Sequence, residues 1–301
     1  MHCTPNLFLI GAPRAGSTSL AQALASHPDV CFSMFKEPHY FMYDGAAPQL
    51  GGPGDDQFLR VIDRTWEDYC RNFSHFEGEA YVAEGSTNYL YHSASLVRIR
   101  ERCPDAQFVV VLRNPVRRAY SAYLHMRKLG HESLLHFEAA MVEEESRISR
   151  GWGPMWHYRR QGLYGELLVR ALEIVEPTRL HVVFYEDLFD GGVKTLQGLL
   201  RSIGLREATL EIPWRHQGGI RKENPIYKLL YPRPRMARSL GARAPRWVRR
   251  VVRNLRSHSL EGAPPLSAEC VEGLYDQYFR SDGHLLKATL PAHSVPWLRT
   301  T

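Results

Sequence analysis

A short loop near the start of the sequence carries residue types that bind anions. Residues 11–20 read Gly-Ala-Pro-Arg-Ala-Gly-Ser-Thr-Ser-Leu and lie between the apolar run Leu7–Ile10 and a helical pattern. A loop that joins a strand to a helix exposes backbone N–H groups at the helix N-terminus, where they bind phosphate. The lysine of a nucleotide-triphosphate P-loop is absent, because Ser17 stands in its place. We therefore predict a phosphate site without that lysine, formed by Arg14, Ala15, Gly16, Ser17, Thr18 and Ser19.

A second group of residues suited to phosphate follows another apolar run. Phe108–Leu112 is followed by Arg113-Asn114-Pro115, and Ser121 lies about two helical turns after Arg113. A guanidinium and a hydroxyl at this spacing can close on one phosphate. A nucleotide kinase usually has an aspartate for Mg²⁺ at the corresponding strand end, and this sequence has an arginine. Two phosphate sites without a metal carboxylate indicate a nucleotide phosphorylated at both ends of its ribose, and we expect no metal site.

Both loops require strands whose carboxyl ends meet at one edge of a sheet. Apolar runs predict buried strands, and the intervening segments have helical patterns. This alternation predicts an α/β fold, a P-loop-like doubly wound parallel sheet flanked by helices, with ligands at the strand carboxyl ends. The predicted strands are Leu7–Ile10, Tyr81–Ala83, Phe108–Leu112 and Leu180–Tyr185, and the predicted helices are Ser93–Arg102, Val116–Leu129, Leu135–Ser149, Tyr164–Val175 and Val193–Ile203.

The length of 301 residues suits a single domain over residues 1–301. We expect its core at about 5–205 and a mostly helical, proline-rich excursion at about 215–265. A closing helix is expected at about 267–280, with Ser267 as its N-cap.

Positive charge is concentrated in the excursion. Arg221–Arg256 contains twelve lysines and arginines and one acid, whereas the whole chain has a net charge of +6. This stretch is either a solvated arginine-rich surface or a basic wall that contacts an anionic ligand, substrate or membrane surface. The sequence contains no recognised nucleic-acid-binding module, so no nucleic-acid partner is expected.

The cysteines and the chain start favour a cytoplasmic protein. The five cysteines are scattered and form no C-x-x-C pair, so neither a disulfide framework nor a cysteine zinc site is indicated. No run approaches the ~20 apolar residues of a membrane span. The first predicted strand begins too soon after Met1 to leave room for a signal peptide.

Four segments together resemble the sulfotransferases that use 3′-phosphoadenosine-5′-phosphosulfate (PAPS). Residues 11–20, and Arg113-Asn114-Pro115 with Ser121, are similar to the two nucleotide-binding motifs of that family. Residues 36–41 (Lys-Glu-Pro-His-Tyr-Phe), and residues 162–168 followed by 185–188, resemble the branch of the heparan sulfate sulfotransferases and their bacterial relatives. The likeness covers about residues 5–205. It implies that the first loop binds the 5′-phosphosulfate and that Arg113 and Ser121 bind the 3′-phosphate.

The resemblance also implies catalytic residues. Glu37 matches the base that takes the acceptor proton, and its pKa is either raised by the apolar neighbours or held low by Lys36. Arg14 would stabilise the leaving phosphate, at a place where the heparan branch commonly has lysine. His125 stands at a spacing where N-sulfating relatives carry a functional histidine, so the base is Glu37 or a histidine. His39 is expected to orient the acceptor.

Further residues are expected to contact the two ligands. Lys36, Thr87 and Tyr89 are predicted substrate contacts, since residues 84–89 resemble a family segment that lines the active site. Gly85 departs from that pattern, because relatives often have lysine there. Arg221 and Lys222 are candidates to replace the basic loop that closes on the 3′-phosphate, although the usual Lys-Gly motif is absent.

The sequence therefore predicts a metal-independent sulfotransferase. It would move the sulfuryl group of PAPS in line to a hydroxyl, or less readily an amine, and release adenosine 3′,5′-bisphosphate (PAP). The acceptor stays open among a small molecule, a glycolipid and a saccharide, and the sequence carries no signal of oligomeric state. The alternatives are a P-loop nucleotide kinase, which the missing lysine disfavours, and a non-catalytic nucleotide- or anion-binding protein, which the intact segment 36–39 disfavours.

Overall fold

The computed structural model describes residues 4–45, 48–213, 219–221, 260–262 and 264–298. Its centre is a five-stranded parallel sheet with the strand order β2-β3-β1-β4-β5. The strands are β1 (Leu7–Gly11), β2 (Val30–Phe32), β3 (Tyr81–Glu84), β4 (Gln107–Leu112) and β5 (Leu180–Phe184). The chain leaves β1 on one side for β2 and β3 and returns on the other side as β4 and β5. This reversal places a ligand crevice at the carboxyl ends of β1 and β4, and the predicted fold class is confirmed.

The strands form where residues can be buried on both faces of the sheet. Leu7–Ile10 and Phe108–Leu112 are at most 1% exposed, which explains why both read as continuous apolar runs. β2 was not predicted, because its three residues are too few to show a period. Tyr185 was predicted as the end of β5, but it begins the helix α9 (Tyr185–Asp190) instead.

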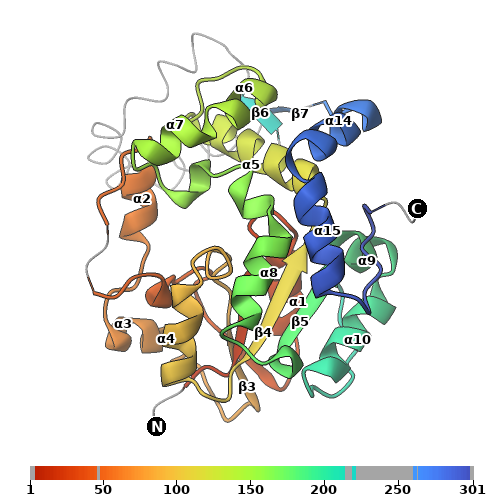
Figure 1. Ribbon diagram of the computed structural model, residues 1–301. Coiled ribbons are helices and arrows are strands. Elements are labelled where there is room, and N and C mark those ends of the chain that lie inside the picture. Colours follow the sequence, from red (N-terminus) through yellow and green to blue (C-terminus); the bar gives the residue numbers. More distant parts are fainter. Residues whose placement is uncertain (1–3, 46–47, 214–218, 222–259, 263, 299–301) are drawn as a thin grey trace.

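Helices cover the sheet on both faces. In Figure 1, α8 (Tyr164–Leu172) and α15 (Arg280–Thr289) cross in front of the sheet, and α1 (Ser17–Ala25) lies behind it. Gly165 permits close packing of α8 on α15, since a Cβ there would lie 2.6 Å from the Asp282 carbonyl oxygen. The Asp282 carboxylate accepts hydrogen bonds from the N–H groups of Gly165 and Glu166, both at 2.9 Å. The remaining helices near the sheet are α4 (Ala94–Arg102) and α10 (Val193–Ser202), with the 3₁₀ turn η4 (Pro177–Arg179) before β5.

The C-terminal part begins as predicted and then continues. α14 (Ala268–Tyr278) starts at the predicted cap, where the Ser267 hydroxyl accepts a hydrogen bond from Cys270 N at 3.1 Å. A further helix, α15, follows and was not predicted. Most of the basic stretch Arg221–Arg256 lies outside the described residues. At its edges, β6 (Gly219–Arg221) and β7 (Leu260–Gly262) form an antiparallel pair.

A group of helices that we call the cap stands above the carboxyl edge of the sheet (Figure 1). The cap consists of α2 (Asp55–Arg60), α5 (Pro115–Leu129), α6 (Phe137–Val142), α7 (Glu144–Ser149) and the 3₁₀ turns η2 (Pro154–Trp156) and η3 (Arg160–Gly162). α3 (Trp66–Arg71) and the 3₁₀ turn η1 (Tyr40–Met42) lie at the side of the sheet. A second apolar cluster, separate from that of the sheet, packs around α5 and includes Val116, Tyr123, Phe137 and Trp156.

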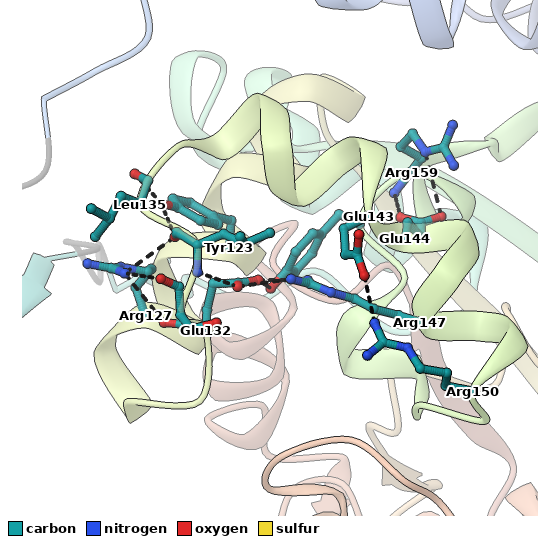
Figure 2. Close-up of polar contacts among 12 residues, drawn as sticks. Tyr123, Arg127, Glu132, Leu135, Glu143, Glu144, Arg147, Arg150 and Arg159 are labelled. Carbon is teal, nitrogen blue, oxygen red and sulfur yellow. Dashed lines mark hydrogen bonds and ion pairs between the residues drawn. The ribbon is translucent and has the colours of Figure 1, made fainter.

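A buried ion pair holds the cap together, as Figure 2 shows. The Arg147 guanidinium donates to both Glu132 carboxylate oxygens, at 2.7 and 2.9 Å, and the Tyr158 hydroxyl donates to Glu132 at 3.0 Å. The predicted single helix Leu135–Ser149 is wrong, because it begins at Phe137 and is interrupted at Glu143. After this interruption the Glu144 carboxylate is buried and accepts backbone N–H groups of residues 159 and 160. That tertiary contact leaves no trace in the local sequence pattern.

No helix within the described ranges is both long and apolar enough to cross a membrane.

Candidate active site

A cleft of about 780 Å³ opens at the carboxyl ends of β1 and β4, below the cap. Its walls come from the loop before α1, from α5, from α2 and from the turns η2 and η3. The cleft brings together segments that are far apart in the sequence. Its polar lining includes Arg14, Ser17, Thr18, Ser19, Glu37, Thr87, Asn88, Arg113, Arg117, Ser121, His125, Lys128 and Gln161.

The first predicted phosphate loop forms one wall of this cleft. Gly16 caps α1 with φ of 92°, and a Cβ at this position would lie 2.9 Å from the Tyr185 ring. Only glycine fits that conformation and that close approach. Arg14, Gly16, Ser17, Thr18 and Ser19 line the cleft. Ala15 is fully buried behind them, so only its backbone can belong to the site.

The second predicted motif meets the first loop directly. Arg113 Nη1 donates to the Arg14 carbonyl oxygen at 3.2 Å, and Arg14 Nε lies 3.4 Å from Ser121 Oγ. The Arg113 guanidinium also stacks 4.4 Å above the Tyr185 ring. Parallel strands β1 and β4 pair side by side, and this pairing joins two loops that are about 100 residues apart in the chain.

The cleft carries an excess of positive charge. Four of its lining residues, Arg14, Arg113, Arg117 and Lys128, are basic, whereas Glu37 is the acid among the described lining residues. Burial and the neighbouring Arg113 lower the pKa of Arg14. Arg113 Nε is buried and has no hydrogen-bond partner among the described residues. A polyanionic ligand would relieve both the repulsion and the unmet donor.

Glu37 lies across the cleft in a set of three polar contacts. Lys36 Nζ is 2.6 Å from Glu37 Oε1, His39 Nε2 is 3.2 Å from Oε2, and Thr87 Oγ1 donates to Oε1 at 3.2 Å. Burial raises the pKa of Glu37, but the charge of Lys36 and the hydrogen bond and charge of His39 outweigh it and hold the pKa below its usual range. Of the two possibilities open from the sequence, the structure supports the ionised carboxylate.

Backbone strain is concentrated at three of the predicted catalytic residues. Arg14, Glu37 and His39 have φ of 68°, 67° and 53°, and they are the non-glycine residues with positive φ in the described part of the chain. Such conformations persist only where the surrounding structure holds them, and they cluster at functional sites. No sequence pattern predicted this feature.

Three predicted residues are absent from the lining of the cleft. His39 is 1% exposed and acts on Glu37, so it supports the carboxylate and does not line the cleft. Lys36 pairs with Glu37 and is likewise absent from the lining. Tyr89 is fully buried, and its hydroxyl accepts the N–H of Phe41 at 3.2 Å. The expectation that Tyr89 contacts substrate is therefore corrected, because its ring belongs to the core.

One positioning residue was missed. Glu84, at the end of β3, is fully buried and accepts a hydrogen bond from Ser86 Oγ at 2.8 Å. Ser86 Oγ in turn accepts the N–H of His39 at 3.0 Å, so this chain of contacts holds the loop that carries Glu37. Burial raises the pKa of Glu84 to about 7, against the effect of its hydrogen bonds from Ser86 and Tyr89. An acid at the end of a predicted buried strand was the available signal.

His125 lines the cleft one helical turn after Ser121, as the spacing predicted. Burial and then the charge of Arg14 lower its pKa to about 4. The imidazole is therefore neutral at pH 7, and it can donate a hydrogen bond from one ring nitrogen and accept one at the other.

Two predicted residues cannot be placed in the site. Lys222 lies outside the described residues, and of Arg221 the structure describes only the backbone, in β6. Within the described ranges, no group of three or more His, Cys, Asp or Glu side chains is arranged to hold a metal ion.

Much of the chain is similar to known proteins in sequence and fold. A model of the sulfotransferase family matches residues 5–209. The crystal structure of a sulfotransferase from Alicyclobacillus acidocaldarius aligns with a TM-score of 0.66 and 30% identity, over 76% of this chain and 90% of that one.

Curated relatives share shorter stretches. The bifunctional heparan sulfate N-deacetylase/N-sulfotransferase 1 of Caenorhabditis elegans is 28% identical over 48% of this chain and 16% of its own length. The human carbohydrate sulfotransferase 15 is 24% identical over 62% of this chain and 41% of its own length. The chain thus spans less than half the length of these relatives. The family match covers the sheet, both phosphate loops and the Glu37 loop, and we conclude that the chain belongs to the sulfotransferase family.

Proposed function

We propose that this protein transfers the sulfuryl group of PAPS to a hydroxyl of an acceptor and releases PAP. The observation that carries the proposal is the meeting of the two phosphate motifs, through Arg14, Arg113 and Ser121, across a cleft from an ionised Glu37. A nucleotide kinase has less support, because this cleft lacks both the P-loop lysine and an aspartate at the end of β4.

The cleft fits a nucleotide with 3′- and 5′-phosphates. The N–H groups around Gly16 at the start of α1 would hold the 5′-phosphosulfate. Arg113, whose Nε is buried without a partner, and Ser121 would hold the 3′-phosphate. The excess of basic residues in the lining would balance the charge of the nucleotide.

The reaction follows from what each residue can do. Bound PAPS supplies a sulfuryl group whose S–O bond to the 5′-phosphate breaks as the acceptor oxygen bonds to sulfur. Glu37 accepts the proton of that acceptor hydroxyl, and Lys36, His39 and Thr87 hold the carboxylate in place. Arg14 stabilises the negative charge that stays on the released phosphate, and as an arginine it keeps its own proton.

His125 has a separate role in this proposal. Because it is neutral at pH 7, it can hydrogen-bond to the acceptor hydroxyl or to a sulfuryl oxygen without adding charge. Should Glu37 prove dispensable, the neutral imidazole is the second candidate base.

Nucleotide binding tests the donor assignment. We expect PAP to bind more tightly than adenosine 5′-phosphate, and Arg113→Ala to weaken PAP by about 10- to 100-fold, the range for a lost hydrogen bond to a charged group. The preference for PAP over adenosine 5′-phosphate should then disappear. Arg150→Ala, which removes an exposed arginine of the cap, is the matched control and should leave both affinities unchanged. Equal binding of the two nucleotides by the unmodified protein would contradict the proposal.

Transfer is tested with labelled PAPS and a panel of hydroxyl and amine acceptors, read by mass spectrometry. We expect a sulfated product that forms equally well with EDTA present, and no phosphoryl transfer from ATP and Mg²⁺. We further propose a cytoplasmic location and no nucleic-acid partner. A saccharide, a lipid-linked or a small-molecule acceptor can each be examined in the same assay. We also propose that Arg221–Arg256 contacts anionic surfaces, which co-sedimentation with anionic vesicles would test.

A further inference from the structure

Besides Glu37 and His125, the lining of the cleft includes apolar side chains. Phe58 of α2, Leu124 and Met126 of α5 and Met155 of η2 form this surface, which we call the apolar wall. These residues come from three elements of the cap. None of them belongs to the two phosphate motifs.

The apolar wall lies next to the catalytic carboxylate. The Phe58 ring packs against the His39 ring, with centroids 5.1 Å apart, and His39 contacts Glu37. Leu124 is adjacent to His125 on α5. An acceptor whose hydroxyl reaches Glu37 therefore places the rest of its body against this wall.

Some polar lining groups of the cleft already bond to other residues. Gln161 Nε2 donates to Asn88 Oδ1 at 3.1 Å and to the Pro154 carbonyl at 2.8 Å, and its Oε1 lies 3.4 Å from Arg118 Nη1. The Thr87 hydroxyl donates to Glu37. These contacts use part of the polar lining, and a ligand with several hydroxyl groups would need a partner for each of them, because burying such groups unpaired is costly.

We infer that the acceptor is an alcohol with an apolar alkyl or aryl body, which the apolar wall binds, rather than a polyhydroxylated saccharide. This inference rests on the proposed function, since it assigns the acceptor of the same site. It sets this chain apart from the carbohydrate sulfotransferases among its relatives. Phe58 and Met155 are then the residues that determine acceptor specificity.

A series of straight-chain primary alcohols tests the contact between the acceptor and the apolar wall directly. With saturating PAPS, each added CH₂ that enters the wall should raise kcat/KM by about fourfold, until the cleft is filled. Phenols should also react, whereas glucosamine and cellobiose should react at least about tenfold less efficiently than hexanol. A kcat/KM that does not change along the series, together with efficient sulfation of the saccharides, would overturn the inference.

Substitution of a residue of the apolar wall tests whether the wall causes the chain-length dependence of kcat/KM. Met155→Gln keeps the side-chain length and adds polarity at a partly buried position, so it should flatten the chain-length dependence and leave PAP affinity unchanged. Leu135→Gln, at an exposed leucine of the cap, is the matched control and should retain the full dependence. An unchanged dependence in Met155→Gln would place the acceptor elsewhere.

Calorimetry separates this inference from the proposed function. If PAP does not bind at all, the proposed function fails. If PAP binds and the saccharides are the better substrates, only the acceptor assignment fails. If PAP binds and no acceptor is turned over, the acceptor assignment is tested by binding of the alcohol series to the PAP-loaded protein. An affinity that rises with chain length supports the apolar wall. No binding contradicts it.

Discussion

The two halves of the cleft are built in different ways. The half proposed to bind the nucleotide consists mainly of loops that directly follow buried strands of the sheet, such as those of Arg14 and Arg113, and α5 adds Ser121 to it. The half proposed to bind the acceptor consists of helices and turns of the cap, which pack on their own apolar cluster and on the buried Glu132–Arg147 pair. Sheet geometry thus supports the half that we propose binds the donor, whereas the half that we propose selects the acceptor depends on a separately packed layer.

Strain is distributed in the same uneven way. Arg14, Glu37 and His39, with positive φ, all lie at the carboxyl edge of the sheet, where parallel strands and buried hydrogen bonds hold them. The wall residues of the acceptor half are ordinary members of helices and turns. We therefore expect substitutions near the sheet to change the chemical step, and substitutions in the cap to change stability and acceptor choice.

The largest expected effect is a loss of stability when the buried ion pair of the cap is broken. Glu132→Ala leaves the buried Arg147 guanidinium without its partner, which typically costs about 3–5 kcal/mol of unfolding free energy. Urea denaturation measures this loss. The double variant Glu132→Gln with Arg147→Met removes the charge and should recover much of the stability. If Glu132→Ala unfolds at the urea concentration of the unmodified protein, the pair does not support the cap.

Removal of the carboxylate tests the chemistry of the sheet edge. Glu37→Gln keeps the size and cannot accept the proton, so kcat should fall about 10²-fold or more while PAP affinity changes less than about threefold. Single-turnover kinetics and calorimetry give the two quantities. Near-normal turnover would move the role of base to His125.

We expect the charge of Arg14 to raise kcat. Arg14→Ala is expected to lower kcat by about 10²-fold, the scale of a lost preorganised donor to developing charge. Arg14→Lys keeps the charge and should recover part of the rate, because a lysine commonly stands there in the resembled branch. Equal rates for the two variants would show that charge at this position is unimportant.

The pH dependence sharpens the assignment of the titrating groups. Glu37 stays ionised and His125 stays neutral from about pH 8 down to about pH 5, because both pKa values are lowered. The rate should therefore be nearly constant over this range and fall only as His125 gains a proton near pH 4. The groups that act on His125 are Arg14, Lys128, Glu37 and His131. His125→Asn should remove this acid limb, and a midpoint near pH 6.5 in the unmodified protein would argue against the buried histidine.

The pH dependence of stability is tested at the buried Glu84. Its pKa of about 7 in the folded protein lies above the usual 4.5, so the folded state holds the proton more tightly and stability falls as pH rises from about 4.5 to about 7. Glu84→Gln is neutral throughout and should show a smaller loss of stability between pH 5 and pH 8. The exposed Glu173→Gln is the control and should retain the pH dependence of the unmodified protein. Thermal unfolding at the two pH values distinguishes them.

The sequence by itself determined the parallel sheet, the two phosphate loops, the Glu37 loop and the family. Each of these depends on a few consecutive residues beside a strand that is buried on both faces, so residue type and spacing suffice. Only the tertiary structure decided that His39 and Lys36 hold Glu37 ionised, that Tyr89 is a core residue and Glu84 a support, and that the helix at 135–149 is interrupted. It also decided the apolar wall, because Phe58 and Met155 are nearly 100 residues apart and line the same cleft only through the packing of the cap. Such contacts depend on which buried surfaces fit together, and no local pattern in the chain records that fit.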